Sequence, residues 1–155
     1  DYDKPLYLLT EERSLSDNLK GLRSIGIDNV AGYFDAAQVR EAGLRTQGYR
    51  SEGPAELAAR IQTGQVRLLD VRAAVEFKES HIPGAEHRFL GTLLRGINGL
   101  DRSKPVVTQC QSGGRSAIAA SILQRAGFDV INLQGGLSAW LKAGLPVRSG
   151  GPEHR

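Results

Sequence analysis

The chain has 155 residues, 40% hydrophobic and 24% charged, which is typical of a globular protein with one well-buried domain and some length to spare. Its net charge of +3 comes from scattered Lys and Arg residues accompanied by only four Tyr, four Phe and one Trp, so a nucleic-acid partner is not expected. The single cysteine excludes an internal disulfide, and three widely spaced histidines do not match the spacing of metal ligands.

No stretch of the sequence is long and apolar enough to predict a membrane span, and the first residues lack the pattern of a signal peptide. We therefore expect a cytoplasmic protein without a membrane partner. The sequence contains no methionine and begins at Asp1. We interpret it as trimmed, or as cut from a longer reading frame.

The first 46 residues are predicted to contain two strands that alternate with two helices. These elements cover residues 4–9, 14–25, 28–34 and 35–42. A polar stretch that contains glycine, residues 47–53, is interpreted as a linker.

Residues 54–147 are predicted to form a second domain of alternating strands and helices. The predicted strands cover 66–71, 106–109 and 129–133, with a brief one after the turn at 81–85, and the predicted helices cover 54–62, 73–79, 90–97, the segment before Gly127 and the segment before Gly144. This alternation predicts an α/β fold in which helices cover both faces of a parallel sheet. The tail, 148–155, has no apolar pattern and is expected to be mobile.

An internal repeat relates the two regions. Lys4-Pro5 precedes Lys104-Pro105 by 100 positions, and Gly26 precedes Gly127 by 101. The first copy has Thr10 in the place of Cys110, followed by an acidic loop instead of a glycine-rich one. We interpret residues 1–46 as the back half of a degenerate, inactive copy, a strand-helix-strand half-repeat whose unpaired sheet edge could bind a second chain to form a dimer.

The candidate site is the loop that follows the strand over 106–109. It begins at Cys110, at the end of the strand where sites lie in such folds. The loop amides, the free N–H groups at the start of the next helix and the charge of Arg115 all favour a thiolate and an anionic substrate. The candidate catalytic residues are Cys110 and Arg115, and the candidate substrate-binding residues are Gln111, Ser112, Gly113, Gly114 and Ser116.

Residues 54–147 resemble a rhodanese domain, a sulfurtransferase module. The resemblance is carried by three motifs: Leu69-Asp70-Val71-Arg72 with Glu76-Phe77 and His81-Ile82-Pro83-Gly84-Ala85, the loop from Cys110 to Ser116, and Gly135-Gly136 with Trp140. Ser80 departs from the family pattern, which usually has glycine there. A shorter resemblance, over residues 25–33, links the first copy to the thiol-less middle domain of proteins that join a persulfide dioxygenase of metallo-β-lactamase fold to rhodanese domains, which implies a fused or associated dioxygenase.

The resemblance implies a double displacement without cofactor. The Cys110 thiolate takes the outer sulfur of a donor such as thiosulfate, becomes a persulfide, and passes that sulfur to a thiophilic acceptor. Arg115 is expected to orient the donor, and the loop amides to stabilise both sulfur anions. Ser116 either starts the helix or donates to the sulfur, and neutral Gln111 predicts a preference for less highly charged donors, such as glutathione persulfide.

Five further residues are interpreted as structural rather than catalytic. Arg72 and Glu76 are four apart and could pair, and Asp70 could accept backbone N–H bonds at the strand end. His81 is expected to fix a tight turn, and Trp140 to lie in the core.

Two other functions compete with sulfur transfer. A phosphatase or arsenate reductase also uses a thiolate and an arginine, but only four residues separate Cys110 from Arg115, a shorter loop than those relatives use to encircle a tetrahedral anion. The second alternative is a scaffold or regulatory module without catalysis, against which the intact thiol and arginine argue.

Overall fold

The computed structural model describes residues 4–44 and 48–151. The chain divides into two compact units, one ending at Gly48 and one beginning at Tyr49. Parts of the predicted first copy, linker and tail, namely residues 1–3, 45–47 and 152–155, lie outside the described residues.

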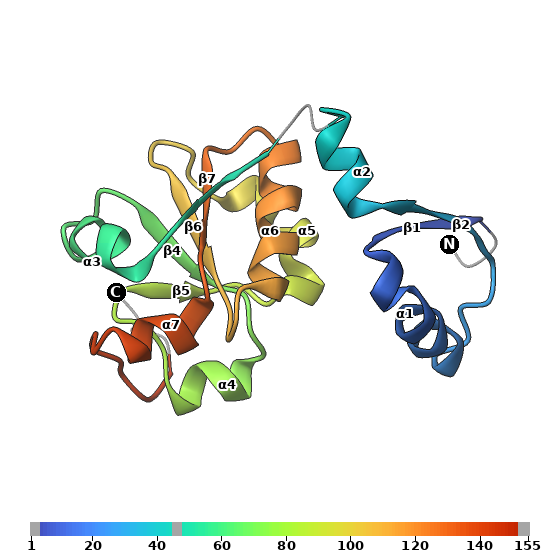
Figure 1. The fold of residues 1–155 in the computed structure, drawn as a ribbon. Coiled ribbons are helices and arrows are strands. Elements are labelled where there is room, and N and C mark those ends of the chain that lie inside the picture. The colour runs from blue at the N-terminus through green and yellow to red at the C-terminus, as the bar shows by residue number, and fades with distance from the viewer. Residues whose placement is uncertain (1–3, 45–47, 152–155) are drawn as a thin grey trace. The chain divides into compact units, whose positions relative to one another are not determined.

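In the first unit, two parallel strands alternate with two helices (Figure 1). The elements are β1 (Leu6–Thr10), α1 (Glu12–Ser24), β2 (Val30–Asp35) and α2 (Ala36–Glu41). Thr10 is buried and accepts a hydrogen bond from the Asn18 side chain at 2.8 Å, so this side of β1 faces α1. On the other side, Tyr7, Leu9 and Phe34 are each more than half exposed.

The second unit is built on a parallel sheet of five strands in the order β3-β7-β6-β4-β5. Its strands are β3 (Arg50–Glu52), β4 (Arg67–Asp70), β5 (Ala85–His87), β6 (Val106–Gln109) and β7 (Val130–Leu133), and its helices are α3 (Pro54–Gln62), α4 (Ala74–Glu79), α5 (Leu93–Gly96), α6 (Gly114–Arg125) and α7 (Gly136–Lys142). The predicted α/β fold with a parallel sheet is confirmed.

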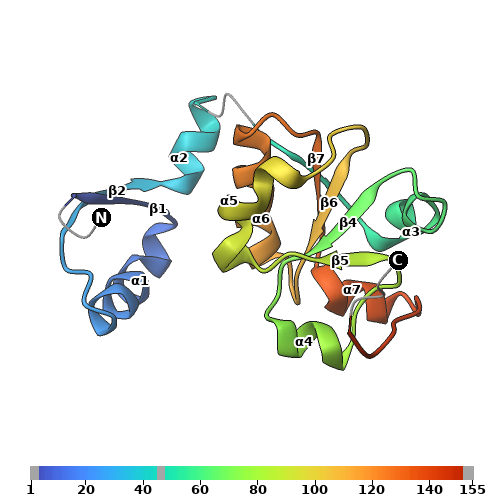
Figure 2. The same cartoon turned by 180° about the vertical axis from the view of Figure 1, so that it is seen from behind.

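Helices cover both faces of this sheet, and each face has its own apolar core (Figures 1 and 2). Leu93 of α5 and Leu123 of α6 pack on the face that carries Val106. Burial of such side chains stabilises the fold by about 1.5–3 kcal/mol each.

On the opposite face, α3 and α7 enclose the second core (Figure 1). Leu57 and Trp140 pack there with Val107 and Ile131. Successive residues of β6 thus point to opposite faces, as the alternation of a strand requires. The prediction that Trp140 lies in the core is confirmed, since it is 3% exposed and donates its indole N–H to the Pro146 carbonyl.

Three local predictions are corrected. Arg50–Glu52, in the predicted linker, form β3, a short polar edge strand that gains its hydrogen bonds from β7. The predicted helix over 90–97 is divided into a 3-10 turn at Leu90–Thr92, α5, and a second 3-10 turn at Ile97–Gly99, since glycine recurs there and disfavours a continuous helix. The tail is not free at its start, because Arg148 and His81 exchange backbone hydrogen bonds.

The first turn of α7 holds the loop that follows β6. The Leu137 N–H donates to the Cys110 carbonyl at 2.8 Å, and the Ser138 N–H donates to the Gln111 carbonyl at 3.0 Å. Gly136 makes this approach possible, because it has a φ of +57° and a Cβ there would lie 2.2 Å from the Cys110 carbonyl oxygen. A side chain at this position would push the helix away from the loop.

We predict that Gly136→Ala destabilises the second unit far more than Gly144→Ala. Gly144 also has a positive φ, +69°, but a Cβ there meets nothing within 4 Å. Gly144→Ala should therefore cost only the left-handed conformation, about 1–2 kcal/mol, whereas Gly136→Ala adds an overpacking cost of about 1–3 kcal/mol. Urea unfolding followed by the fluorescence of Trp140, the only tryptophan, measures both. Equal losses would contradict the steric role of Gly136.

Candidate active site

Cys110 lies directly after β6, at the carboxyl end of the sheet's central strand, and is 1% exposed. Its Sγ accepts the Gly113 N–H at 3.2 Å and the Ser116 hydroxyl at 3.5 Å. Burial raises the pKa of the thiol, but hydrogen bonds from the Ser116 side chain and from the amides of Ser116, Gly113 and Ser112 outweigh it, so the pKa lies below its ordinary value. The site therefore favours the thiolate.

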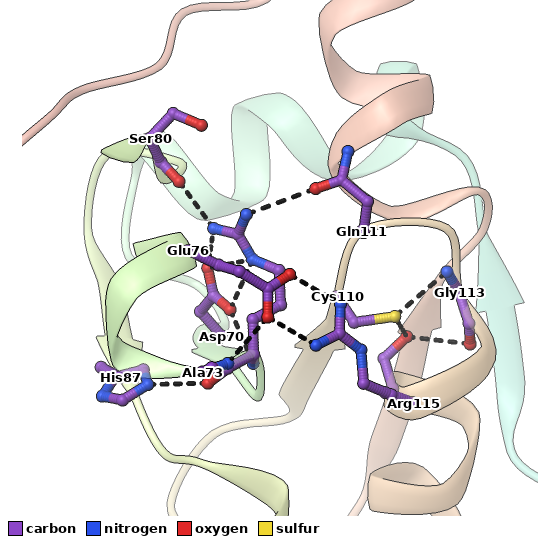
Figure 3. Close-up of polar contacts among 11 residues, drawn as sticks. Asp70, Ala73, Glu76, Ser80, His87, Cys110, Gln111, Gly113 and Arg115 are labelled. Carbon is purple, nitrogen blue, oxygen red and sulfur yellow. Dashed lines mark hydrogen bonds and ion pairs between the residues drawn. The ribbon is translucent and has the colours of Figure 1, made fainter. Parts of the chain in front are cut away.

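The loop conformation directs the Gly113 amide toward the sulfur (Figure 3). Gly113 has a φ of +104°, a left-handed conformation that glycine adopts readily, and α6 begins at Gly114. The structure thus brings Ser112, Gly113 and Ser116 around Cys110, as the sequence predicts. Ser116 lies in the first turn of α6, and its hydroxyl lies 3.5 Å from the sulfur and 3.0 Å from the Gly113 carbonyl oxygen.

Arg115 is paired with a carboxylate from another element. Its Nη1 and Nη2 donate to the two carboxylate oxygens of Glu76 at 2.6 and 2.8 Å (Figure 3). This pairing lowers the pKa of Glu76 to about 2. It also raises the pKa of Arg115, as does, more weakly, the charge of the Cys110 thiolate.

Asp70 and Arg72 form a buried ion pair, with side chains 0% and 2% exposed. Asp70 accepts the Arg72 backbone N–H at 3.0 Å, as expected at a strand end, and also the guanidinium at 2.6 Å. The predicted pairing of Arg72 with Glu76 is wrong. α4 begins at Ala74, so Arg72 precedes the helix and the four-residue spacing does not place the two side chains on one helical face.

Gln111 is exposed beside the loop, and its side chain is held from two sides. Its Oε1 accepts from Arg72 Nη1 at 3.4 Å, and its Nε2 donates to the Ser138 hydroxyl at 3.0 Å. The residue that follows Cys110 therefore presents a neutral amide side chain beside the loop (Figure 3).

His81 packs against α4, and its expected role in fixing the turn stays a prediction. Its ring stacks on Phe77 at a centroid distance of 4.0 Å, and its Nδ1 is hydrogen-bonded to the Phe77 carbonyl at 2.9 Å. Ser80, where glycine is usual in the resembled family, has a φ of −162°, an extended conformation open to any residue. Its carbonyl accepts from Arg72 at 2.6 Å.

Besides the Arg115–Glu76 pair, sequence reasoning missed two further contributions to this site. His87 contacts the Arg72 carbonyl through Nε2 at 2.8 Å, and nothing in its sequence context marks it. The amides of α7 that bind the loop were also missed, although Gly135-Gly136 could have indicated a close backbone approach.

No cluster of three or more His, Cys, Asp or Glu suited to hold a metal ion occurs among the residues that the structure describes. Among the same residues, no helix has both the length and the apolar character needed to span a bilayer.

Comparisons with known proteins agree on one family. An HTH-type transcriptional regulator of Mycobacterium tuberculosis is 35% identical over 100 residues, which are 63% of this chain and 44% of the regulator. A sulfurtransferase of Allochromatium vinosum is 34% identical over 86 residues, 55% of this chain and 80% of that protein. The chain thus spans less than half of the regulator but most of the sulfurtransferase.

Solved structures and a family model extend this agreement. The crystal structure of a rhodanese-related protein from Thermoplasma volcanium superposes with a TM-score of 0.61 at 30% identity, covering 64% of this chain and 98% of that one. The model of the rhodanese-like domain matches residues 53–143, which include β4, the Cys110 loop and α7. The chain belongs to the rhodanese-like domain family.

Proposed function

We propose that the chain is a sulfurtransferase that moves sulfane sulfur from thiosulfate or a glutathione-type persulfide to a thiophilic acceptor through a persulfide on Cys110. The observation that carries this proposal is the set of N–H and O–H donors around Cys110 Sγ, with Gly113 at 3.2 Å and Ser116 at 3.5 Å. Relatives named sulfurtransferases, such as that of Allochromatium vinosum, support it.

In the first half-reaction, the Cys110 thiolate attacks the outer sulfur of the donor. A new S–S bond forms, the old S–S bond breaks, and its electron pair leaves on sulfite from thiosulfate or on a thiolate from an organic persulfide. No oxidant or proton is consumed when the donor reacts as its anion. The N–H and O–H groups that stabilise the thiolate by hydrogen bonds are also expected to stabilise the persulfide anion.

In the second half-reaction, an acceptor thiolate, sulfite or cyanide attacks the outer sulfur of the Cys110 persulfide. The S–S bond then breaks with its electron pair on Cys110, which restores the thiolate. Both steps need the same cradle for a sulfur anion, so one loop serves the whole cycle. Neither step draws on a cofactor.

We further propose that residues 1–46 are the back half of a degenerate copy of the same fold. The order β1, α1, β2, α2 supports this, because it repeats the order β6, α6, β7, α7. In the described residues, β1 pairs only with β2, and its other edge could bind a second chain. A fused or associated persulfide dioxygenase and a cytoplasmic location belong to the same proposal.

The proposed persulfide can be tested by intact mass. After incubation with thiosulfate or glutathione persulfide and removal of excess donor, the chain should gain the mass of one sulfur atom. Cyanide should remove it, and Cys110→Ser should not acquire it because Cys110 is the only cysteine. If the mass does not increase with either donor, the proposed sulfur transfer is rejected in favour of a scaffold or regulatory module without catalysis.

We predict that Ser116→Ala raises the pKa of Cys110. The Ser116 hydroxyl lies 3.5 Å from the sulfur and contributes to lowering this pKa, so its loss disfavours the thiolate. The thiolate absorbance should then appear at higher pH, and sulfur transfer at neutral pH should slow as the thiolate fraction falls. Ser121→Ala is the control, since that hydroxyl of α6 donates only within its helix, to Ala117. An unchanged titration would contradict the role of Ser116.

We also predict that Gln111→Arg increases kcat/KM for thiosulfate relative to glutathione persulfide, on the order of tenfold, because a cation beside the loop attracts the two charges at the reacting end of thiosulfate more strongly than the single charge of the persulfide sulfur. Gln62→Arg is the matched control. It adds the same charge at the end of α3. This helix precedes β4, so its end lies near the amino ends of the strands, away from the Cys110 loop at their carboxyl ends. Unchanged relative turnover in Gln111→Arg would reject the interpretation of Gln111.

A further inference from the structure

The charged side chains around the Cys110 loop are already paired within the protein. Arg115 is bound by Glu76 through both terminal nitrogens, and Arg72 is bound by Asp70 (Figure 3). The formal charges of each pair cancel, and Gln111 adds none. With the thiolate formed, these five side chains and Cys110 together carry a charge of about −1.

Glu76 is fixed in this arrangement by two elements at once. Its Oε2 accepts the Ala73 N–H at 3.0 Å at the start of α4, while both carboxylate oxygens receive Arg115 of α6. Because the bond from Arg115 lowers the pKa of Glu76 to about 2, the carboxylate stays charged wherever the thiolate exists. The positive charge of Arg115 is therefore offset by the Glu76 carboxylate at every pH at which the thiolate exists.

We propose that Glu76 is a specificity-determining residue, which neutralises Arg115 and so selects sulfur donors with a single negative charge at the reacting end, organic persulfides, over the dianion thiosulfate. This inference rests on the proposed sulfur transfer. It gives Arg115 a role different from the one expected from the sequence: the arginine holds the loop to α4 instead of offering an unpaired cation to the donor.

The charge balance of the first half-reaction explains the selection. When the thiolate attacks an organic persulfide anion, two negative charges meet, and two leave as the Cys110 persulfide and a thiolate. When it attacks thiosulfate, three negative charges meet in the same space. An unpaired arginine would offset the third charge, whereas an arginine bound by Glu76 does not, and repulsion at such short range is strong in a partly buried site.

The test compares kcat/KM for thiosulfate and for 2-hydroxyethyl persulfide, whose anion carries no other charge, in four proteins: the full chain, Glu76→Gln, Glu76→Asp and Glu79→Gln. The amide of Glu76→Gln keeps an acceptor for the Ala73 N–H but releases the charge of Arg115, so the ratio of thiosulfate to persulfide turnover should rise on the order of tenfold. Glu76→Asp retains the carboxylate and should keep the original ratio. Glu79→Gln removes the same charge from an exposed position of α4 and should also keep it.

Ionic strength gives a second readout, one that a purely structural role of Glu76 would not move. In the unmodified chain, added KCl should raise the ratio of thiosulfate to persulfide turnover, since salt screens the excess repulsion of the dianion. In Glu76→Gln the same side chains and the thiolate together carry a charge of about zero, so the same salt should change the ratio much less. The measurement on the unmodified chain stands even where Glu76→Gln is too unstable to assay.

The possible results separate the two proposals. If neither donor is turned over by the unmodified chain, the proposed sulfur transfer itself fails. If persulfide is turned over but the ratio does not rise in Glu76→Gln, or if salt lowers the ratio in the unmodified chain, sulfur transfer stands and the role of Glu76 is overturned. A rise of equal size in Glu79→Gln would also overturn it, since the effect would then belong to net charge.

Discussion

The direction of the peptide groups between β6 and α6 is the constraint on which the site depends. The carbonyls of Cys110 and Gln111 receive amides of α7, which fixes these peptides with their oxygens turned toward that helix. The following amides are then free to face the sulfur. A hydrogen-bonded backbone holds this orientation before any ligand arrives, so little reorganisation is needed when negative charge develops on sulfur.

Further contacts tie this loop to the end of the neighbouring strand β4 and to the residue that follows α4. Arg72 contacts Asp70 at the end of β4, the Ser80 carbonyl after α4, and Gln111 in the loop (Figure 3). Removing one partner of a buried ion pair typically costs about 3–5 kcal/mol. The Arg72 guanidinium therefore links three segments through contacts whose separate loss would reduce stability. These contacts also hold the Cys110 loop in place.

Local sequence patterns predicted the alternating elements and the Cys110 loop, because strand and helix periodicity and a contiguous glycine-rich motif are properties of neighbouring residues. The pairing of Arg115 with Glu76 was not predicted, since these residues are 39 positions apart and meet only when α4 and α6 reach the same edge. The predicted Arg72–Glu76 pair failed for a related reason, as spacing implies a pair only where both residues lie in one helix. β3 was missed because its three polar residues owe their conformation to β7.

The burial of Cys110 has a consequence for how the protein tolerates its own reactivity. A disulfide between two copies requires their cysteine Cα atoms to approach within about 7 Å, which a thiol that is 1% exposed beneath a folded loop prevents. Since the chain has no other cysteine, folded copies are not expected to form disulfides with one another. In the proposed persulfide, the sulfur to be transferred lies one S–S bond, about 2 Å, beyond the Sγ atom of Cys110.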